Sequence, residues 1–179
     1  MKKILFTGLT GLLGKYFVEN KWKEYGIAGT YSSNKVNYKG VDLFKLNVKD
    51  KKKVLELINK INPQVVVHAA SIGNVDQCEK NPGEAYEVNV EGTKNVLEGC
   101  MNVGAKIIFI SSNAVYNGKK PPYDENSTRS PLDVYGKTKQ KAEEAVINSG
   151  VPYVIVRLMT MYGWQPKGAR VNPATWVIE

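Results

Sequence analysis

The sequence predicts an α/β fold built on a doubly wound parallel sheet, and three observations predict it. Short apolar runs alternate with helical periodicity along the 179 residues. Val65 to Val67 form a continuous β-branched run, as expected for a strand buried on both faces. A glycine-rich turn at residues 8–14 follows the first apolar run and leads directly into a helix. Regular alternation of this kind indicates a parallel sheet with helices on both faces.

The same patterns place the individual elements. Strands are expected at 4–7, 27–31, 42–46, 65–67, 107–110 and 153–158, and helices at 12–24, 50–61, 83–102 and 134–149. We expect the strand order 3-2-1-4-5-6 and a surface loop at 117–131. The positions expected to pack inward are Leu12, Leu13, Tyr16 and Phe17; Val54, Ile58 and Ile61; and Val88, Gly92, Val96 and Gly99, the last group spaced to pack closely against the sheet.

The composition excludes several classes of function. Two cysteines, Cys78 and Cys100, and one histidine, His68, are too few for a four-ligand zinc site or a disulfide framework, so no metal is expected. The whole excess of +8 lies within residues 1–60, and the basic residues of the full chain are 22 Lys and only three Arg, which argues against nucleic acid and favours small anions such as phosphates. No apolar run is long enough for a membrane span and no leader is evident, so we expect no membrane association and a cytoplasmic location.

The glycine-rich turn predicts a dinucleotide site. Glycines at such positions permit a tight turn, let the backbone approach a pyrophosphate and allow close packing of helix on strand. The helix N-terminus offers N–H groups and a positive dipole to the anion. A tight turn without a ligand is the alternative. The residues of the turn expected to bind cofactor are Gly8, Thr10, Gly11, Leu12, Leu13 and Gly14.

The residues after the second strand indicate which dinucleotide is bound. An acidic side chain about 20 residues after the glycines favours NAD, because it bonds the ribose 2′-hydroxyl. This chain has Ser32, Ser33, Asn34 and Lys35 there, and no acid before Asp42. Hydroxyls and a lysine suit a 2′-phosphate, so we predict that NADP(H) is preferred, while NAD(H) stays open as a second cofactor.

Three polar residues predict the chemistry. Tyr135 and Lys139 are four residues apart on a predicted helix and therefore project from the same face. A tyrosine is a poor acid or base near neutral pH, but a nearby ammonium favours its phenolate and brings proton exchange into range. Ser112 ends the fifth strand, at the sheet edge where ligands of such folds bind. We therefore predict Ser112, Tyr135 and Lys139 as the catalytic group.

With these motifs the chain resembles the extended short-chain dehydrogenase/reductase superfamily, and within it the dTDP-4-dehydrorhamnose reductase family. The resemblance covers nearly the whole chain. The segments that carry it are the turn at 8–14, His68-Ala69-Ala70, Asn74-Val75-Asp76 with Cys78-Glu79, Asn89-Val90 with Gly92-Thr93, the stretches 111–118 and 130–139, Val156-Arg157, and Tyr162-Gly163.

The resemblance implies reduction of C4 of a nucleotide-linked 4-keto-6-deoxysugar by NADPH, in the biosynthesis of deoxysugars or cell-surface polysaccharides. Tyr135 would protonate the new alkoxide, Lys139 would hold the nicotinamide ribose and lower the tyrosine pKa, and Ser112 would bind the carbonyl oxygen. The family has Thr and Asp where this chain has Ser112 and Asn113, so its substrate preference can differ; it has Leu-Asp-Val where this chain has Leu46-Asn47-Val48. Further cofactor contacts implied are Asn47, Val48, His68, Ala69 and Ala70, and the substrate contacts implied are Val75, Asp76 and Asn113.

Several of these residues have a structural interpretation as well. His68 either packs beneath the cofactor or acts as an acid-base, and packing is favoured. Asp76 either orients a short helix or faces the substrate, and Arg157 either pairs with a structural carboxylate or binds an anion. Cys78 and Cys100 are most simply core residues. Tyr116 and Trp164 either stack on a base or sugar or pack in the core.

Two alternatives to a reductase stay open. One is a nucleotide-sugar 4-epimerase or dehydratase, although Asn113-Ala114 argues against a dehydratase. The other is a non-catalytic NADP-binding regulatory subunit resembling that of methionine adenosyltransferase. We expect residues 1–158 to form the dinucleotide-binding domain with the catalytic group, and residues 159–179 to begin a truncated substrate-binding region, with a helix starting near 172. A homodimer through the helices at 84–102 and 134–149 is a further expectation.

Overall fold

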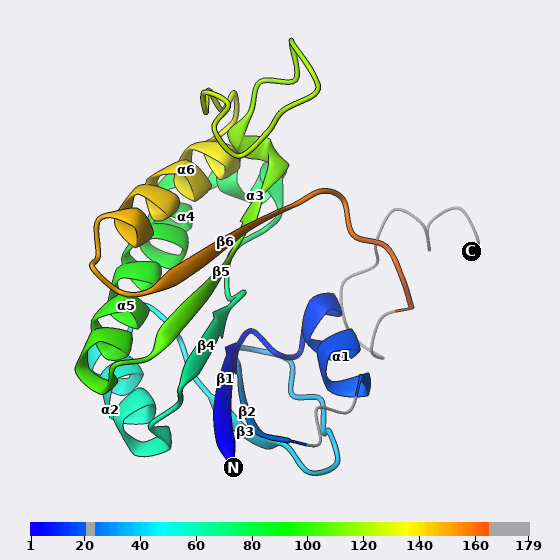
Figure 1. Ribbon diagram of the computed structural model, residues 1–179. Helices are drawn as coiled ribbons and strands as arrows, with labels where there is room; N and C mark the ends of the chain where they lie inside the picture. The colour runs from blue at the N-terminus through cyan, green and yellow to red at the C-terminus, as the bar shows by residue number, and fades with distance from the viewer. Residues whose placement is uncertain (21–23, 165–179) are drawn as a thin grey trace.

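The computed structural model describes residues 1–20 and 24–164. At its centre lies a six-stranded sheet in the order β3-β2-β1-β4-β5-β6, with every strand pair parallel (Figure 1). The predicted fold class and strand order are therefore confirmed. The strands are β1 (Lys2–Thr7), β2 (Tyr25–Tyr31), β3 (Asp42–Lys45), β4 (Val65–His68), β5 (Lys106–Ser112) and β6 (Tyr153–Leu158).

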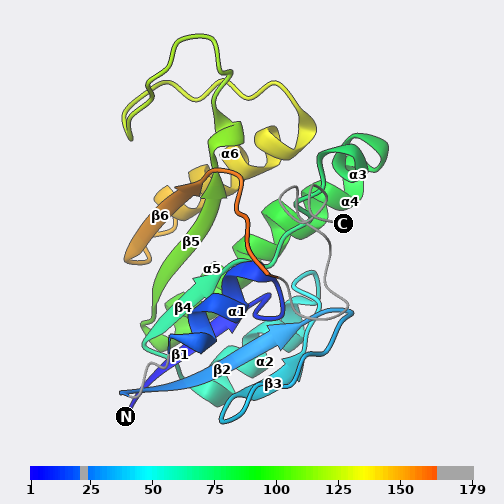
Figure 2. The same cartoon turned by 90° about the vertical axis from the view of Figure 1, so that its right-hand side faces the viewer.

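The helices lie on both faces of this sheet, with α1 on one face and α2, α5 and α6 on the other (Figure 1). The loop at 117–131 projects from the end of β5 in both views (Figure 2). The helices are α1 (Leu12–Glu19), α2 (Lys51–Ile61), α3 (Val75–Lys80), α4 (Pro82–Tyr86), the π-helix η1 (Glu87–Glu91), α5 (Gly92–Val103), the 3-10 turn η2 (Asn113–Val115) and α6 (Val134–Ile147).

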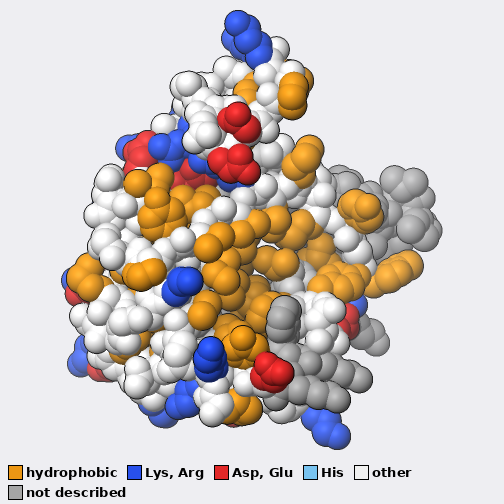
Figure 3. All heavy atoms as spheres, in the orientation of Figure 1, with side chains coloured by type: hydrophobic (Ala, Val, Ile, Leu, Met, Phe, Trp, Pro, Cys, Tyr) orange, Lys and Arg blue, Asp and Glu red, His pale blue; other side chains and the backbone are white. Residues whose placement is uncertain are grey.

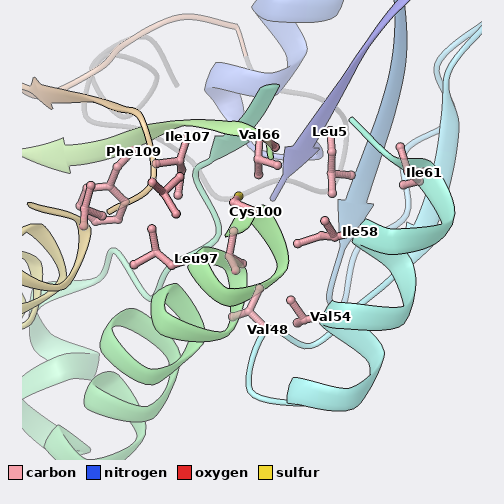
Figure 4. Close-up of a cluster of buried hydrophobic side chains, with 14 of the residues drawn as sticks. Leu5, Val48, Val54, Ile58, Ile61, Val66, Leu97, Cys100, Ile107 and Phe109 are labelled. Carbon is pink, nitrogen blue, oxygen red and sulfur yellow. The ribbon is translucent and has the colours of Figure 1, made fainter. Parts of the chain in front are cut away.

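The larger core lies between the sheet and α2, α5 and α6. Leu5 and Phe109 from the strands meet Ile58 from α2 and Leu97 from α5 (Figure 4). A smaller cluster around Phe6 lies under α1. Cys78 and Cys100 are both buried and unpaired, as their structural interpretation predicts. The predicted inward positions Val54, Ile58, Ile61 and Val96 are buried as well.

Some details of the predicted elements are wrong. Helix α1 ends at Glu19, with Asn20 as its C-cap: the Asn20 N–H makes the last i→i−4 bond to the Tyr16 carbonyl, and the Asn20 side-chain amide donates to the same carbonyl. The rest of the predicted 12–24 helix lies partly outside the described residues. Tyr16 is 36% exposed, and its hydroxyl accepts a hydrogen bond from the Trp164 N–H. Gly92 and Gly99 face Val48 and Ile58 rather than the sheet, since a Cβ on either would meet those side chains at 2.6 and 2.5 Å.

The predicted helix at 83–102 is in fact three consecutive elements, α4, η1 and α5, and the short helix α3 precedes it. The π-turn η1 contains Asn89, which is buried. The Asn89 amide accepts from the Ile72 N–H at 2.8 Å and donates to the Thr138 hydroxyl at 3.0 Å. These two distant partners account for the local widening of the helix, which periodicity does not reveal. Such π-bulges are frequent at functional sites.

Candidate active site

The glycine-rich turn is held tightly between β1, β2 and β4. Gly8 has a φ of 74°, a left-handed conformation, and a Cβ there would lie 3.0 Å from the Ala70 backbone. The Gly8 N–H donates to the Thr30 hydroxyl at 3.2 Å. A Cβ on Gly14 would lie 2.0 Å from the Leu9 carbonyl oxygen, so α1 approaches the turn as closely as glycine allows. Gly11 precedes α1 and offers no side chain to cap its first N–H groups, which leaves that end open to an anion.

A cavity of about 250 Å³ opens above this turn at the carboxyl ends of the strands. In Figure 3 hydrophobic side chains gather around a hollow on this face. Ser112, Tyr135 and Lys139, the predicted catalytic group, all line the cavity together with the glycine-rich turn. The complete lining is Gly8, Gly11, Leu12, Leu13, Ala69, Ser71, Gly73, Ile110, Ser111, Ser112, Tyr135, Lys139, Leu158, Met159 and Met161.

The segment after β6 leads from the end of that strand toward α1 (Figures 1 and 2). Met159 and Met161 line the cavity. The Trp164 carbonyl accepts from the Lys15 ammonium at 2.6 Å, and the Trp164 N–H donates to the Tyr16 hydroxyl at 2.9 Å. The Trp164 side chain itself is 66% exposed, so it is not part of the core. The sequence analysis did not single out Met159 or Met161, because methionines after a strand carry no distinguishing pattern.

Tyr135 is kept in its protonated form by its surroundings. Burial raises the pKa of the Tyr135 phenol, and hydrogen bonding to Ser112 opposes that rise only in part. The sequence predicts that Lys139 lowers the pKa of Tyr135. That pKa is raised instead, so the predicted direction is wrong. The Lys139 ammonium donates instead to the Ile110 carbonyl at 2.6 Å and lies 4.6 Å from the centre of the Phe109 ring.

Lys139 is almost completely enclosed, with 3% of its surface exposed. Burial lowers the pKa of Lys139 to about 8, and the negative charge of Glu143 acts in the opposite direction. An ammonium with a pKa of about 8 is still mostly charged at neutral pH. The site therefore combines a protonated phenol with a charged lysine.

His68 is a buried structural residue at the end of β4, and it is not among the residues that line the cavity. The Thr93 hydroxyl donates its one proton to the Asn89 carbonyl at 2.7 Å, so it must accept from His68 Nε2 at 3.1 Å. His68 Nδ1 then accepts from the Thr7 hydroxyl at 2.6 Å. Burial, with a smaller effect of the Lys139 charge, lowers the pKa of His68 to about 3. The network fixes a neutral imidazole, which agrees with the packing interpretation rather than an acid-base role.

Glu143 is the main residue of the site region that the sequence analysis missed. It is completely buried on α6, where Arg129 and Arg157 both pair with it, at 3.0 and 2.9 Å. Arg157 thus has the structural carboxylate partner that was one of its two interpretations. Its guanidinium also bonds the hydroxyl of Tyr116, which stacks on Tyr123. The available signal was the position of Glu143, four residues after Lys139.

Other predicted site residues lie away from the cavity lining. Ser32, Ser33, Asn34 and Lys35 are exposed after β2, at the same sheet edge as the cavity, and Asn47 is exposed after β3. Asp76 follows the α3 cap residue Asn74, in the first turn of that helix. The remaining predicted residues outside the lining are Thr10, Gly14, Val48, Ala70, Val75 and Asn113, of which Gly14 and Val48 are buried and Val75 and Asn113 are exposed. Their cofactor or substrate roles stay predictions.

Comparison with known proteins identifies the family. The model of the RmlD substrate binding domain family matches residues 1–172. The chain belongs to this family. It is 35% identical over 166 residues to methionine adenosyltransferase 2 subunit beta of Xenopus tropicalis, covering 90% of this chain and 48% of that protein. It is 30% identical over 168 residues to dTDP-4-dehydrorhamnose reductase of Aggregatibacter actinomycetemcomitans, covering 91% and 53%.

Solved structures of similar proteins share the fold. A dTDP-4-dehydrorhamnose reductase from Bacillus anthracis in complex with NADP aligns with a TM-score of 0.81 at 29% identity, covering 99% of this chain and 59% of that one. A UDP-glucose 4-epimerase from Thermus thermophilus in complex with NAD aligns with a TM-score of 0.84 at 26% identity, covering 93% and 58%. The chain spans about half the length of the curated relatives it matches. Among the described residues, no helix has the length and apolar character that a membrane crossing requires.

Proposed function

We propose that the protein carrying this chain reduces a nucleotide-linked 4-keto-6-deoxysugar with NADPH, as a reductase of the dTDP-4-dehydrorhamnose reductase type. The observation that carries the proposal is one cavity lined by both the glycine-rich turn and the side chains of Ser112, Tyr135 and Lys139. A reductase needs both its dinucleotide and its proton donor within reach of one substrate carbonyl, because the hydride goes to the carbon and the proton goes to the oxygen. Membership of the family and the reductase among the relatives support the same reaction.

The residues present fit a nicotinamide dinucleotide. Gly8 and Gly11 leave room at the turn where Cβ atoms would come within 3.0 to 3.4 Å of backbone, and the open end of α1 suits a pyrophosphate. Ser32, Ser33 and Lys35 would take the 2′-phosphate of NADP(H), which makes NADP(H) the preferred cofactor and NAD(H) a second one. The bound nicotinamide supplies the hydride.

The chain's own side chains would supply the remaining chemistry. Ser112 would donate a hydrogen bond to the carbonyl oxygen, and the Tyr135 hydroxyl would give its proton to the same oxygen as the alkoxide forms. A phenol whose pKa is raised by burial holds that proton at neutral pH, which suits the direction of reduction. Lys139 would hold the nicotinamide ribose through its charged ammonium. Val75, Asp76 and Asn113, which lie outside the lining of this cavity, are proposed as further substrate contacts.

A second candidate is a non-catalytic NADP-binding regulatory subunit. The specific observation in its favour is the 35% identity to methionine adenosyltransferase 2 subunit beta, above the 30% identity to the reductase. The presence of Ser112, Tyr135 and Lys139 in one cavity favours the reductase. A 4-epimerase, the function named in one of the aligned structures, would keep its NAD tightly bound through purification.

The test uses the longest natural form of the protein beside the 179-residue chain. NADPH and NADH binding are followed by the change in nucleotide fluorescence, and NADPH oxidation is followed with dTDP-4-keto-6-deoxymannose. We expect tighter binding of NADPH than of NADH, and turnover in the longer protein that Tyr135→Phe abolishes without loss of NADPH binding. Tyr153→Phe, on the exposed surface of β6, is the matched control and keeps full turnover. NADPH binding without reduction of any ketosugar nucleotide would favour the regulatory subunit, and an absence of dinucleotide binding would overturn both proposed functions.

A further inference from the structure

Glu143 is buried and fully hydrogen-bonded, unlike a typical glutamate on a helix surface. Its side chain is completely buried, and both carboxylate oxygens are saturated with donors from three other parts of the chain. Oε1 accepts from the Ser111 hydroxyl at 2.5 Å and from Arg157 Nε at 3.0 Å. Oε2 accepts from Arg129 at 3.0 Å and from a second Arg157 nitrogen at 2.9 Å. A buried carboxylate held this way stays ionised, and these donors lower its pKa despite its burial.

Side chains of α6 contact three successive residues at the end of β5. The Lys139 ammonium donates to the Ile110 carbonyl, the Ser111 hydroxyl donates to Glu143, and hydrogen bonding with Ser112 offsets part of the rise in the pKa of the Tyr135 phenol. Tyr135, Lys139 and Glu143 are spaced four residues apart and therefore share one face of the helix. Ser111 lines the cavity, so Glu143 holds a cavity residue of β5 against the helix that carries Lys139.

The charges around Lys139 come from four elements. Tyr135 and Glu143 share α6 with Lys139, and His68 faces it from β4 as a neutral imidazole. Arg157 on β6 and Arg129 in the 117–131 loop stand behind Glu143, against its carboxylate. Among the described residues, Glu143 is the one carboxylate whose charge supports the Lys139 ammonium, while burial works against it. Without the carboxylate, three cations would share one largely buried region.

We propose that Glu143 is a positioning residue of the candidate active site, whose buried carboxylate keeps the enclosed Lys139 ammonium charged and holds Ser111 of β5 against α6. The inference deepens the proposed function, since a charged Lys139 matters there for the cofactor ribose. Glu143 acts through Lys139, because Glu143 itself does not line the cavity. A purely structural ion pair with Arg157 is the competing interpretation.

The two interpretations predict different changes in the Lys139 pKa when either the negative or the positive partner of the ion pair is removed. Glu143→Gln removes a negative charge next to Lys139, whereas Arg157→Gln breaks the same ion pair but removes a positive one. If Glu143 supports the ammonium, Glu143→Gln lowers the pKa of Lys139 by roughly one to three pH units, and Arg157→Gln leaves it unchanged or raised. A merely structural pair predicts that both variants disturb Lys139 in the same direction.

The pKa of Lys139 is measured directly, by an NMR titration of the lysine ε-carbons in the 179-residue chain without cofactor. The Lys139 signal is the one missing from Lys139→Met. Glu144→Gln is the matched control, because Glu144 is the next residue on α6 and bonds only Gln140 at 3.0 Å; it leaves the Lys139 pKa unchanged. If Glu143→Gln does not fold, the double variant Glu143→Gln/Arg157→Gln is compared with Arg157→Gln, and we expect a Lys139 pKa at least about one unit lower in the double variant.

The outcomes separate this inference from the proposed function. An unchanged Lys139 pKa in Glu143→Gln, or an equal fall in Arg157→Gln, overturns the role of Glu143 whether or not the protein binds NADPH. If the wild type binds NADPH, its affinity declines above the pH at which Lys139 loses its proton. In Glu143→Gln this pH is lower by the same number of pH units as the Lys139 pKa. When no dinucleotide binds to the wild-type chain, the proposed function fails, and the titration still decides the electrostatic role of Glu143.

Discussion

The neutral imidazole of His68 makes the stability of this protein fall on mild acidification. In the folded chain burial lowers the pKa of His68 from 6.5 to about 3, so the ring stays neutral well below neutral pH. In the unfolded chain the same ring takes up a proton as the pH falls through about 6.5. The unfolded state therefore binds more protons than the folded state between these two values, and the free energy of unfolding decreases as the pH falls through this window.

The size of the effect follows from the shift. Each pH unit between the two pKa values changes the free energy of unfolding by about 1.4 kcal/mol. Between about pH 6.5 and about pH 5 the His68 contribution is thus a loss of about 2 kcal/mol. The carboxylate of Glu143, whose pKa is lowered from 4.5, loses its contribution only at lower pH and does not overlap with this range.

The measurement is urea unfolding at about pH 7 and about pH 5 for the wild type and for His68→Gln. The amide offers one acceptor for Thr7 and one donor for Thr93 but does not titrate. We expect the wild type to lose about 2 kcal/mol more than the variant between the two pH values. The single histidine of the chain also gives unambiguous imidazole NMR signals. Equal losses in both proteins, or a folded imidazole that titrates near its ordinary pKa, would refute the neutral buried ring.

Three further predictions test other parts of the site. Gly14→Ala destabilises the protein by at least about 3 kcal/mol in urea unfolding, because its Cβ would meet the Leu9 backbone at 2.0 Å. Gly11→Ala, whose Cβ would have its nearest contact at 3.4 Å, keeps the stability of the wild type and weakens NADPH binding. The free energy of unfolding of the wild type rises between about pH 8 and about pH 10.5, because the unfolded Lys139 stays protonated over this range and the folded one does not. Lys139→Met lacks that rise; an equal rise in the variant contradicts the burial of a charged lysine. Lys35→Ala raises the dissociation constant of NADPH about tenfold and leaves that of NADH nearly unchanged, and equal effects on both nucleotides would contradict recognition of the 2′-phosphate.

The sheet and its strand order were predictable because the signals are local. Each strand is a short apolar run, and Val65 to Val67 in particular have no polar residue that would place one face in water. The glycine-rich turn and the four-residue spacing of Tyr135 and Lys139 are local in the same sense. The cavity therefore contains the catalytic group that the sequence predicts.

What the sequence did not predict depends on contacts between distant residues. The π-turn at Asn89 exists because its amide bonds Ile72 and Thr138, which are 17 and 49 residues away. Glu143 has the sequence context of a solvent-exposed helical charge, and its burial is explained only by Arg129 and Arg157. The direction of the Tyr135 pKa shift likewise depends on how deeply the fold buries the phenol and on where the Lys139 ammonium points.

Buried hydrogen bonds connect the two halves of the site in one continuous path. It runs from Thr7 on β1 through His68 and Thr93 to the Asn89 carbonyl, and from the Asn89 amide through Thr138 to the Tyr135 carbonyl. Hydrogen bonds have preferred lengths and angles, so they fix the relative position of two elements more narrowly than apolar contacts do. In the proposed reductase, the end of β1, which leads into the glycine-rich turn, and the first turn of α6 would face the carbon and the oxygen of one substrate carbonyl. The path therefore links the part of the chain proposed to hold the hydride donor with the part that carries the proposed proton donor Tyr135, and the π-turn is the element that lets one asparagine reach both sides.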